Sequence, residues 1–167
     1  MELLDLALLI LRIVVGGTLL AHGAQKAFGW WGGPGSQGWT GFMAQMGFRP
    51  PALFAWLSIL AELSGALLVL GLLTPLVAML ITGQVVVIIG AAHWQNGFWN
   101  ANKGYEFPLS LLAAAVAVLL IGPGQFSLDA AIGFYLAPEL RLGLLALGLA
   151  GGLGVLLLQR AMARQAA

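Results

Sequence analysis

Five long apolar runs decide what this chain can fold into. An α-helix needs about 20 apolar residues to cross the hydrocarbon core of a bilayer, and the last two runs are somewhat shorter than that. Of the 167 residues, 60% are hydrophobic and only 8% are charged, whereas a soluble domain carries about 25% charged residues. The sequence therefore predicts an all-α, polytopic membrane protein that crosses the lipid bilayer at about residues 3–28, 51–73, 75–93, 107–122 and 142–158.

The rest of the composition excludes several kinds of site. The chain has no cysteine, so it can form no disulfide, thiolate metal site or iron–sulfur cluster of its own. Its net charge is +1, and without a basic patch we expect no nucleic acid partner. We also expect no metal site and, because no flavin or nucleotide motif is present, no intrinsic cofactor.

All six tryptophans are predicted to lie on one side of the membrane. Threading five helices puts the first and third loops and the last residues on the same side, which we call the tryptophan face and define by Trp30, Trp31, Trp39, Trp56, Trp94 and Trp99. Tryptophans that only anchor helices occupy both interfaces of a membrane. Anchoring is one explanation, but the one-sided placement favours a pocket or docking surface for an apolar, aromatic molecule such as a quinone.

Glu62 is the most demanding polar residue, because it falls near the middle of the second span. A charged carboxylate that faces lipid at that depth costs at least about 2.5 kcal/mol, so it must be paired, protonated or turned toward a cavity. His22 and Lys26 are four residues apart and share one face of the first helix, which makes them the nearest partners for Glu62. The simpler alternatives are a purely structural acid and a lysine that extends to the headgroups.

Other polar residues are expected at the same end of the bundle. His93 ends the third span, and Tyr105 and Glu106 open the fourth. Together with Trp30 they complete a predicted polar pocket open to the tryptophan face, although His93 could be an interfacial residue and Glu106 could form a surface ion pair. Gln84 precedes His93 by nine residues, half a turn out of phase in a regular α-helix, so we predict that it faces elsewhere.

Three further features are predicted to shape the bundle. Arg12 lies inside the first span and needs an anion, for which Asp129 is the best candidate; this structural pair would tie the loop after the fourth span to the first helix. Ser127 is expected to cap a short surface helix in that loop. The fifth span carries two sets of small residues suited to close helix packing: a stripe of Ala146, Ala150 and Gly154, and beside it a GxxxG pair, Gly148 and Gly152.

Four motifs follow one another along the chain: "LLRIVVGGTLLAHGAQKAFGWWGG", "AELSGALLVLGLLTPLVA", "GFWNANKGYEFPLSLL" and "IGPGQFSLDA". In this order they resemble the DoxX family of small bacterial membrane proteins over about residues 8–130. The resemblance implies a four-helix bundle at residues 1–130, a place in the bacterial inner membrane and an association with redox chemistry. Its polar positions correspond to His22, Lys26, Glu62, His93, Tyr105, Glu106 and Asp129. Residues 131–167 depart from the family and are predicted to add a short surface helix, a fifth transmembrane helix and a basic tail.

The leading hypothesis is a membrane subunit of a quinone-linked redox complex. In it His22, Lys26, Glu62 and Glu106 would be the catalytic residues, and His22, Lys26, His93, Trp30 and Tyr105 would bind the quinone. Glu62 or Glu106 would supply protons. The electrons would come from the cofactor of a partner subunit, because this chain has no motif for one.

Three alternatives come from other functional classes. The main one is a noncatalytic accessory subunit that docks into a larger membrane complex through the fifth helix and the tryptophan face. A haem b held by His22 and His93 is less favoured, because such a pair arises readily by chance. A small transporter is also less favoured, because the chain has neither repeats nor paired broken helices.

The distribution of lysine and arginine puts the tryptophan face in the cytoplasm by the positive-inside rule.

Overall fold

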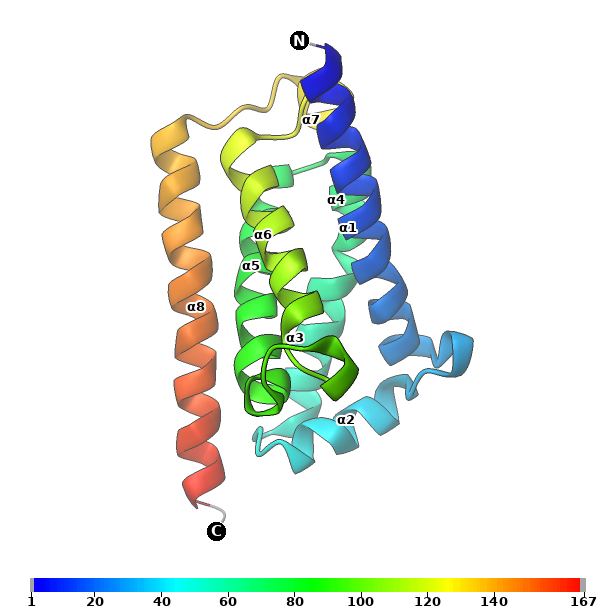
Figure 1. Cartoon of the computed structure of the whole chain (residues 1–167), viewed down its shortest axis with the longest axis vertical. Helices are drawn as coiled ribbons and strands as arrows, with labels where there is room; N and C mark the ends of the chain where they lie inside the picture. Colours follow the sequence, from blue (N-terminus) through cyan, green and yellow to red (C-terminus); the bar gives the residue numbers. More distant parts are fainter. Residues whose placement is uncertain (1, 166–167) are drawn as a thin grey trace.

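The computed structural model describes residues 2–165, and within them it contains helices and no strand. Figure 1 shows a bundle whose long helices run side by side between two ends. The α-helices are α1 (Glu2–Phe28), α2 (Gly35–Gln45), α3 (Pro51–Leu63), α4 (Gly65–Leu70), α5 (Thr74–Ile88), α6 (Glu106–Ile121), α7 (Leu128–Ile132) and α8 (Pro138–Gln165). The predicted all-α architecture is therefore confirmed.

The long helices match the predicted membrane spans. Within residues 2–165, four stretches are long and apolar enough to cross a membrane: Glu2–Phe28, Pro51–Leu70, Thr74–Asn96 and Pro138–Gln165. The fourth predicted span is α6, which is apolar but has only 16 residues and lies beside the others in Figure 1. The chain is thus a multi-pass membrane protein whose surroundings are the lipid bilayer.

Glycines let the helices approach closely at two places. A Cβ on Gly16 of α1 would lie 2.5 Å from the carbonyl oxygen of Gly65, and a Cβ on Gly152 of α8 would lie 2.6 Å from the carbonyl oxygen of Gly83 on α5. Neither position can therefore carry a side chain at this spacing. The predicted GxxxG pair, Gly148 and Gly152, forms the face of α8 that packs on α5, whereas a Cβ on Gly154 of the predicted stripe would meet no heavy atom within 4 Å among the described residues.

The buried corner between α1, α5 and α7 is held by hydrogen bonds to the backbone. The carboxylate of Asp129 accepts from the backbone N–H groups of Leu73, at 2.7 Å, and Thr74, at 2.8 Å, and thereby caps α5. Arg12 donates to the carbonyl oxygen of Phe126. The predicted ion pair between Arg12 and Asp129 is not formed within residues 2–165. Instead, the first turn of α5 offers two N–H donors that the carboxylate satisfies, while Arg12 ties this loop to α1 through a carbonyl.

Hydrogen bonds from polar side chains also fix the connection from α6 to α8. Ser127 caps α7 as predicted, because its Oγ accepts from the backbone N–H of Ala130 at 3.1 Å. From α8, Arg141 donates to the carbonyl oxygens of Leu120 and Ile121 at 2.9 and 2.7 Å. These are terminal carbonyls of α6 that have no partner within their own helix.

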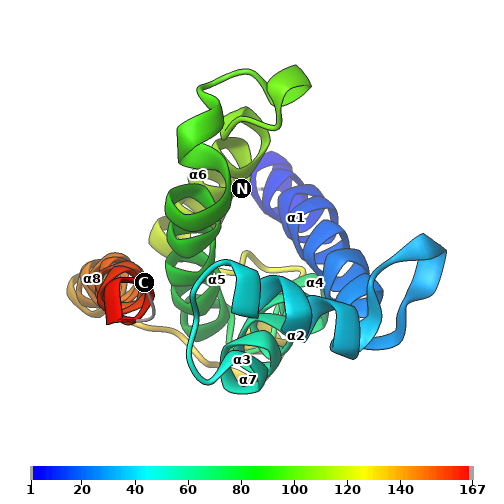
Figure 2. The ribbon, with the colours of Figure 1, turned by 90° about the horizontal axis from the view of Figure 1, so that it is seen from below.

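The tryptophan face is the lower end of the molecule in Figure 1, where α1, α5 and α8 end and α3 and α6 begin. Helix α2 was not predicted. Figure 2, seen from this end, shows it lying across the bundle rather than along it. The sequence gives it little signal, because Gly35, Gly38 and Gly41 dilute its apolar residues. Its position makes it a lid over the space between α1 and α3.

Candidate functional site

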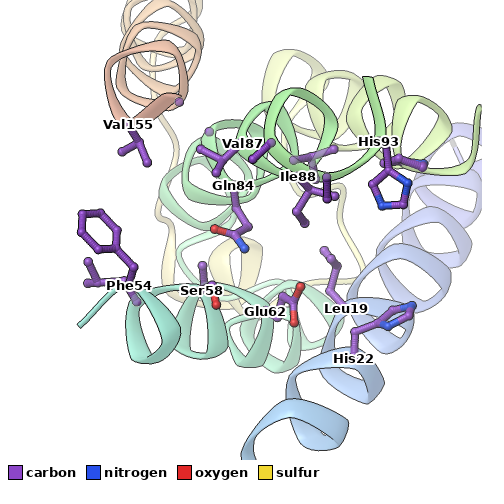
Figure 3. A pocket seen from close by; sticks show the side chains of 18 of the residues that line it. Leu19, His22, Phe54, Ser58, Glu62, Gln84, Val87, Ile88, His93 and Val155 are labelled. Carbon is purple, nitrogen blue, oxygen red and sulfur yellow. The ribbon is translucent and has the colours of Figure 1, made fainter. Parts of the chain in front are cut away.

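A cavity of about 860 Å³ lies inside the bundle at the tryptophan face. Its walls come from α1, α2, α3, α5, α6 and α8. Four of the predicted site residues line it, and we call them the polar cluster: His22, Lys26, Glu62 and His93. Figure 3 shows the side chains of His22, Glu62 and His93 directed toward the same space from three different elements.

Lys26 and Glu62 form the centre of the polar cluster. The Nζ of Lys26 donates to Oε1 of Glu62, and the two side chains are only 12% and 2% exposed. This is the only ion pair found between residues 2 and 165. The second oxygen of Glu62, Oε2, is buried and has no hydrogen-bond partner among these described residues. A carboxylate oxygen buried without a donor is costly, so it marks a place where a donor group would bind favourably.

Helix α2 covers this ion pair with Trp39. The Nε1 of Trp39 donates to Oγ of Ser58 on α3 at 2.7 Å, and Nζ of Lys26 lies 4.1 Å from the centre of its ring. The face of an indole ring attracts a cation, so Trp39 helps to hold the ammonium group that Glu62 binds. The sequence predicts Trp39 only as one of the six tryptophans of the tryptophan face. Its link to Ser58 has no signature in sequence, because α2 and α3 meet through tertiary packing.

His93 enters the cavity in a defined tautomer. Its Nδ1 lies 2.7 Å from the carbonyl oxygen of Lys103. A carbonyl oxygen can only accept, so Nδ1 must carry the proton. In the neutral ring Nε2 then has a lone pair and is a hydrogen-bond acceptor. The polar cluster thus combines a cationic donor, Lys26, with two acceptors, Oε2 of Glu62 and Nε2 of His93.

The prediction that Gln84 faces away from His93 is wrong, because both side chains line the cavity. The reason is a π-helical turn at Ile89–His93, which follows α5 directly. A π-turn holds more residues than an α-turn and changes the phase of everything beyond it. Figure 3 shows Gln84 projecting into the space beside Ser58 and Glu62. Gln84 is a single polar residue in an apolar span, which by itself indicates a residue that faces a cavity. The prediction excluded it because a regular α-helix was assumed between Gln84 and His93.

Three other predicted site residues lie outside the cavity. Trp30 is 55% exposed and packs on Phe28 and Trp31 beyond the end of α1. The ring of Tyr105 stacks on that of Trp94, with centroids 5.2 Å apart. Because they follow tight turns in the loops, these aromatic side chains pack on their neighbours instead of turning inward.

Glu106 also forms its contact within the loop before α6 and not in the cavity. Its Oε2 accepts from the backbone N–H of Asn100 at 2.9 Å. It therefore closes the turn before α6, and neither the predicted place in the pocket nor an ion pair with Lys103 is found in the described structure. At the opposite wall, the ring of His22 lies 6.3 Å from that of Phe107 at the start of α6.

The chemistry available to the cavity is that of hydrogen bonding and proton exchange. Among residues 2–165, no three side chains of the His, Cys, Asp or Glu type come together as a metal site. The polar cluster lies toward one end of the cavity. Ser58, Gln84, Asn96 and Lys103 also line it, and the remaining walls are mostly apolar. Such an arrangement suits an amphipathic molecule with a polar head.

Comparison with known proteins gives one family. No curated protein and no solved structure matches the chain. The model of the DoxX family matches residues 7–94, which are more than half of the 167 residues. The matched region carries His22, Lys26, Glu62 and His93, and so contains the whole polar cluster. The chain is therefore a member of the DoxX family of membrane proteins.

Proposed function

We propose that this chain is a membrane subunit of a quinone-linked redox complex in the bacterial inner membrane, and that its cavity binds the quinone headgroup. The observation that carries this proposal is the buried Oε2 of Glu62, which has no donor among the described residues. A quinol hydroxyl is a donor of the right kind, and a cavity of about 860 Å³ has the size of a small-molecule site.

The residues of the polar cluster fit both protonation states of such a headgroup. Lys26 can donate to a quinone carbonyl, and Glu62 and His93 can accept from quinol hydroxyls. Reduction of the bound quinone to a quinol would take two electrons from the partner subunit and two protons from the water at the tryptophan face. Lys26, which itself lies against Trp39, holds Glu62 in place, and Nε2 of His93 can bind such a proton and pass it on.

Electrons must reach the headgroup from another subunit. The chain has no cysteine and no flavin or nucleotide motif, so a partner carrying a flavin, haem or iron–sulfur cofactor would be the donor. The tryptophan face is the natural docking surface for this partner, because the polar cluster lies at that end of the bundle.

The first experiment is purification of the tagged chain from its native membrane in a mild detergent, with mass spectrometry of bound proteins, lipids and quinones. We expect a stoichiometric redox protein and a bound quinone. The variant Glu62→Gln should retain the fold and lose most of the quinone, whereas Glu139→Gln, on the exposed start of α8, should retain it. Preparations with no quinone in the wild type would overturn the proposal.

One observation favours a second candidate, the noncatalytic accessory subunit. Lys26, Glu62, Trp39 and Ser58 bond to one another and join α1, α2 and α3. Such a network can hold a bundle together without taking part in chemistry. In this case Glu62→Gln would reduce the amount of assembled complex. It would leave the quinone content of each assembled complex unchanged, whereas the redox proposal expects most of the quinone to be lost.

A further inference from the structure

The cavity has two ends of different chemistry. The polar cluster occupies the inner end. Phe54 of α3 and Val155 of α8 lie at the opposite end, which we call the outer end, and Leu57, Leu147 and Gly151 of the same two helices also line the cavity. Figure 3 shows this division, with Phe54 and Val155 on one side of the space and His22 and His93 on the other. A single ligand that fills the whole cavity must therefore have a polar head and an apolar remainder.

The outer end opens at the surface of the bundle. Leu57, Leu80 and Leu147 line the cavity and are nevertheless 53%, 45% and 60% exposed. All three belong to stretches that are long and apolar enough to cross a membrane. Leu80 precedes His93 by thirteen residues along the α5 stretch, which is about 20 Å at 1.5 Å per residue. The opening therefore reaches well away from the tryptophan face and faces the hydrocarbon of the bilayer.

At the tryptophan face, the groove between α3 and α8 is bridged. The Nε2 of Gln159 on α8 donates to the carbonyl oxygen of Met46 at 2.5 Å. The backbone N–H of Arg49 lies 3.4 Å from Sδ of Met162, also on α8. The segment between α2 and α3 is thus attached to the end of α8. The outer end of the cavity is therefore open to the lipid beside it, and the contacts between α8 and the segment before α3 separate it from the water at the tryptophan face.

We infer that the opening between α3 and α8 is a lateral portal, through which the ligand enters from the bilayer and in which its long hydrocarbon tail stays. The ligand class is then a quinone with an isoprenoid tail, not a tail-less quinone that arrives through water. This inference rests on the proposed function, because it assigns the tail of the molecule whose headgroup the polar cluster binds. A ring alone would leave the outer, apolar walls unfilled, whereas a tail gains affinity by covering them.

Gly151 provides a position where the portal can be closed without disturbing the bundle. A Cβ on Gly151 would have no heavy atom within 4 Å among the described residues, yet Gly151 lines the cavity. Gly154 lies one turn further along α8, is equally open within the described structure and does not line the cavity. Gly151→Phe and Gly154→Phe therefore make the same chemical change on the same helix, and only the first fills the portal.

The test measures binding of two probe pairs to purified protein in lipid nanodiscs by quenching of tryptophan fluorescence. One pair is a long-tailed menaquinone and menadione, which is the same ring without the tail. The other is a long-tailed ubiquinone and its tail-less ring. We expect Gly151→Phe to weaken binding of the long-tailed quinone by about tenfold, equal to about 1.4 kcal/mol, and to leave the tail-less ring unchanged. Gly154→Phe should bind both as the wild type does.

The other outcomes separate the portal from the headgroup site. If Gly151→Phe binds both members of a pair like the wild type, the tail lies elsewhere and the portal is overturned while the headgroup site stands. Equal weakening of both members, or the same loss in Gly154→Phe, also overturns the portal, because the effect is then not specific to the tail. If the wild type binds no quinone, the proposed function fails and the portal with it. A phospholipid found in this position in place of a quinone would overturn the assignment of the tail.

Discussion

Lys26 and Glu62 meet across the interface of α1 and α3, 36 residues apart in the sequence, with one carboxylate oxygen bonded and the other buried without a donor in the part of the chain that the structure describes. The bond joins the first two membrane spans. At the same time it leaves half of the carboxylate available to a ligand. The pair therefore contributes both to the stability of the bundle and to the chemistry of the cavity, and the two contributions can be separated by mutation.

We predict that Lys26→Met destabilises the protein on the order of 3 kcal/mol, because it leaves a buried carboxylate without its cation. Glu62→Gln should cost less, since Lys26 lies near the end of α1 and can extend toward water. The double variant should recover most of the loss of Lys26→Met. Thermal unfolding in detergent, followed by tryptophan fluorescence, measures the three variants as a double-mutant cycle. Strictly additive losses would show that the two side chains do not stabilise each other.

The tautomer of His93 can be tested directly. Because Nδ1 donates to the carbonyl oxygen of Lys103, we expect the neutral form of the ring to carry its proton on Nδ1 and to leave Nε2 unprotonated. The chain contains only two histidines, so the ¹⁵N signals of histidine-labelled protein can be assigned with a His22→Phe variant. A His93 ring with its proton on Nε2 and none on Nδ1 would contradict the geometry and remove the acceptor that the proposed function uses.

The sequence predicted the spans because their signal is local. Apolar runs of sufficient length identify them, and Pro51 and Pro75 mark where two of them begin, since both prolines occupy the first turns of their helices. Glu62 and Lys26 were also predictable, because a charge deep in an apolar span requires a partner. These conclusions need only the length, position and charge of residues, all of which can be read directly from the chain.

What the sequence could not show depends on tertiary packing. The π-turn at Ile89–His93 brings His93 to the same cavity as Gln84, and nothing in the local sequence distinguishes it from a regular turn. Asp129 was assigned to Arg12 on charge alone, whereas the folded chain uses its carboxylate to cap α5. Charge can be read from one residue at a time. Whether the carboxylate of Asp129 binds the guanidinium of Arg12 or two backbone N–H groups depends on the folded structure and cannot be read in this way.

Gly71 is predicted to tolerate no side chain. Its φ of +66° is a left-handed conformation, and a Cβ there would overlap the guanidinium of the buried Arg12. Gly71→Ala should therefore cost about 1–2 kcal/mol for the backbone and a further amount, on the order of 2 kcal/mol, for the displaced hydrogen bond of Arg12.

Gly133 is the matched control for Gly71. It ends α7 with a φ of +71°, and its Cβ would meet no heavy atom within 4 Å in residues 2–165. Gly133→Ala should show the backbone cost alone, about 1–2 kcal/mol. Thermal unfolding of both variants measures the difference. Equal losses would mean that Arg12 can move aside without penalty, so that its contact with the carbonyl oxygen of Phe126 does little to hold the corner.

The packing of α8 on α5 gives the last prediction. A Cβ on Gly152 would lie 2.6 Å from the carbonyl oxygen of Gly83 and 2.9 Å from Cβ of Val86. Because a carbonyl oxygen is part of the backbone, it cannot rotate away as a side chain would. Gly152→Ala should therefore move α8 outward and cost about 1–3 kcal/mol, the usual penalty for overpacking. Gly154→Ala adds the same methyl group to an open position and should leave the unfolding temperature unchanged or slightly raised.

The same displacement should also change the cavity. Gly148, Gly151 and Gly152 all line it, so an outward shift of α8 would widen the gap between α8 and α3. We expect Gly152→Ala to accelerate exchange of a bound long-tailed quinone with the bilayer, measured by stopped-flow quenching of tryptophan fluorescence, whereas Gly154→Ala should exchange it at the wild-type rate. Destabilisation of Gly152→Ala with unchanged exchange would separate the two roles of α8. The helix would then brace α5 without controlling access to the polar cluster.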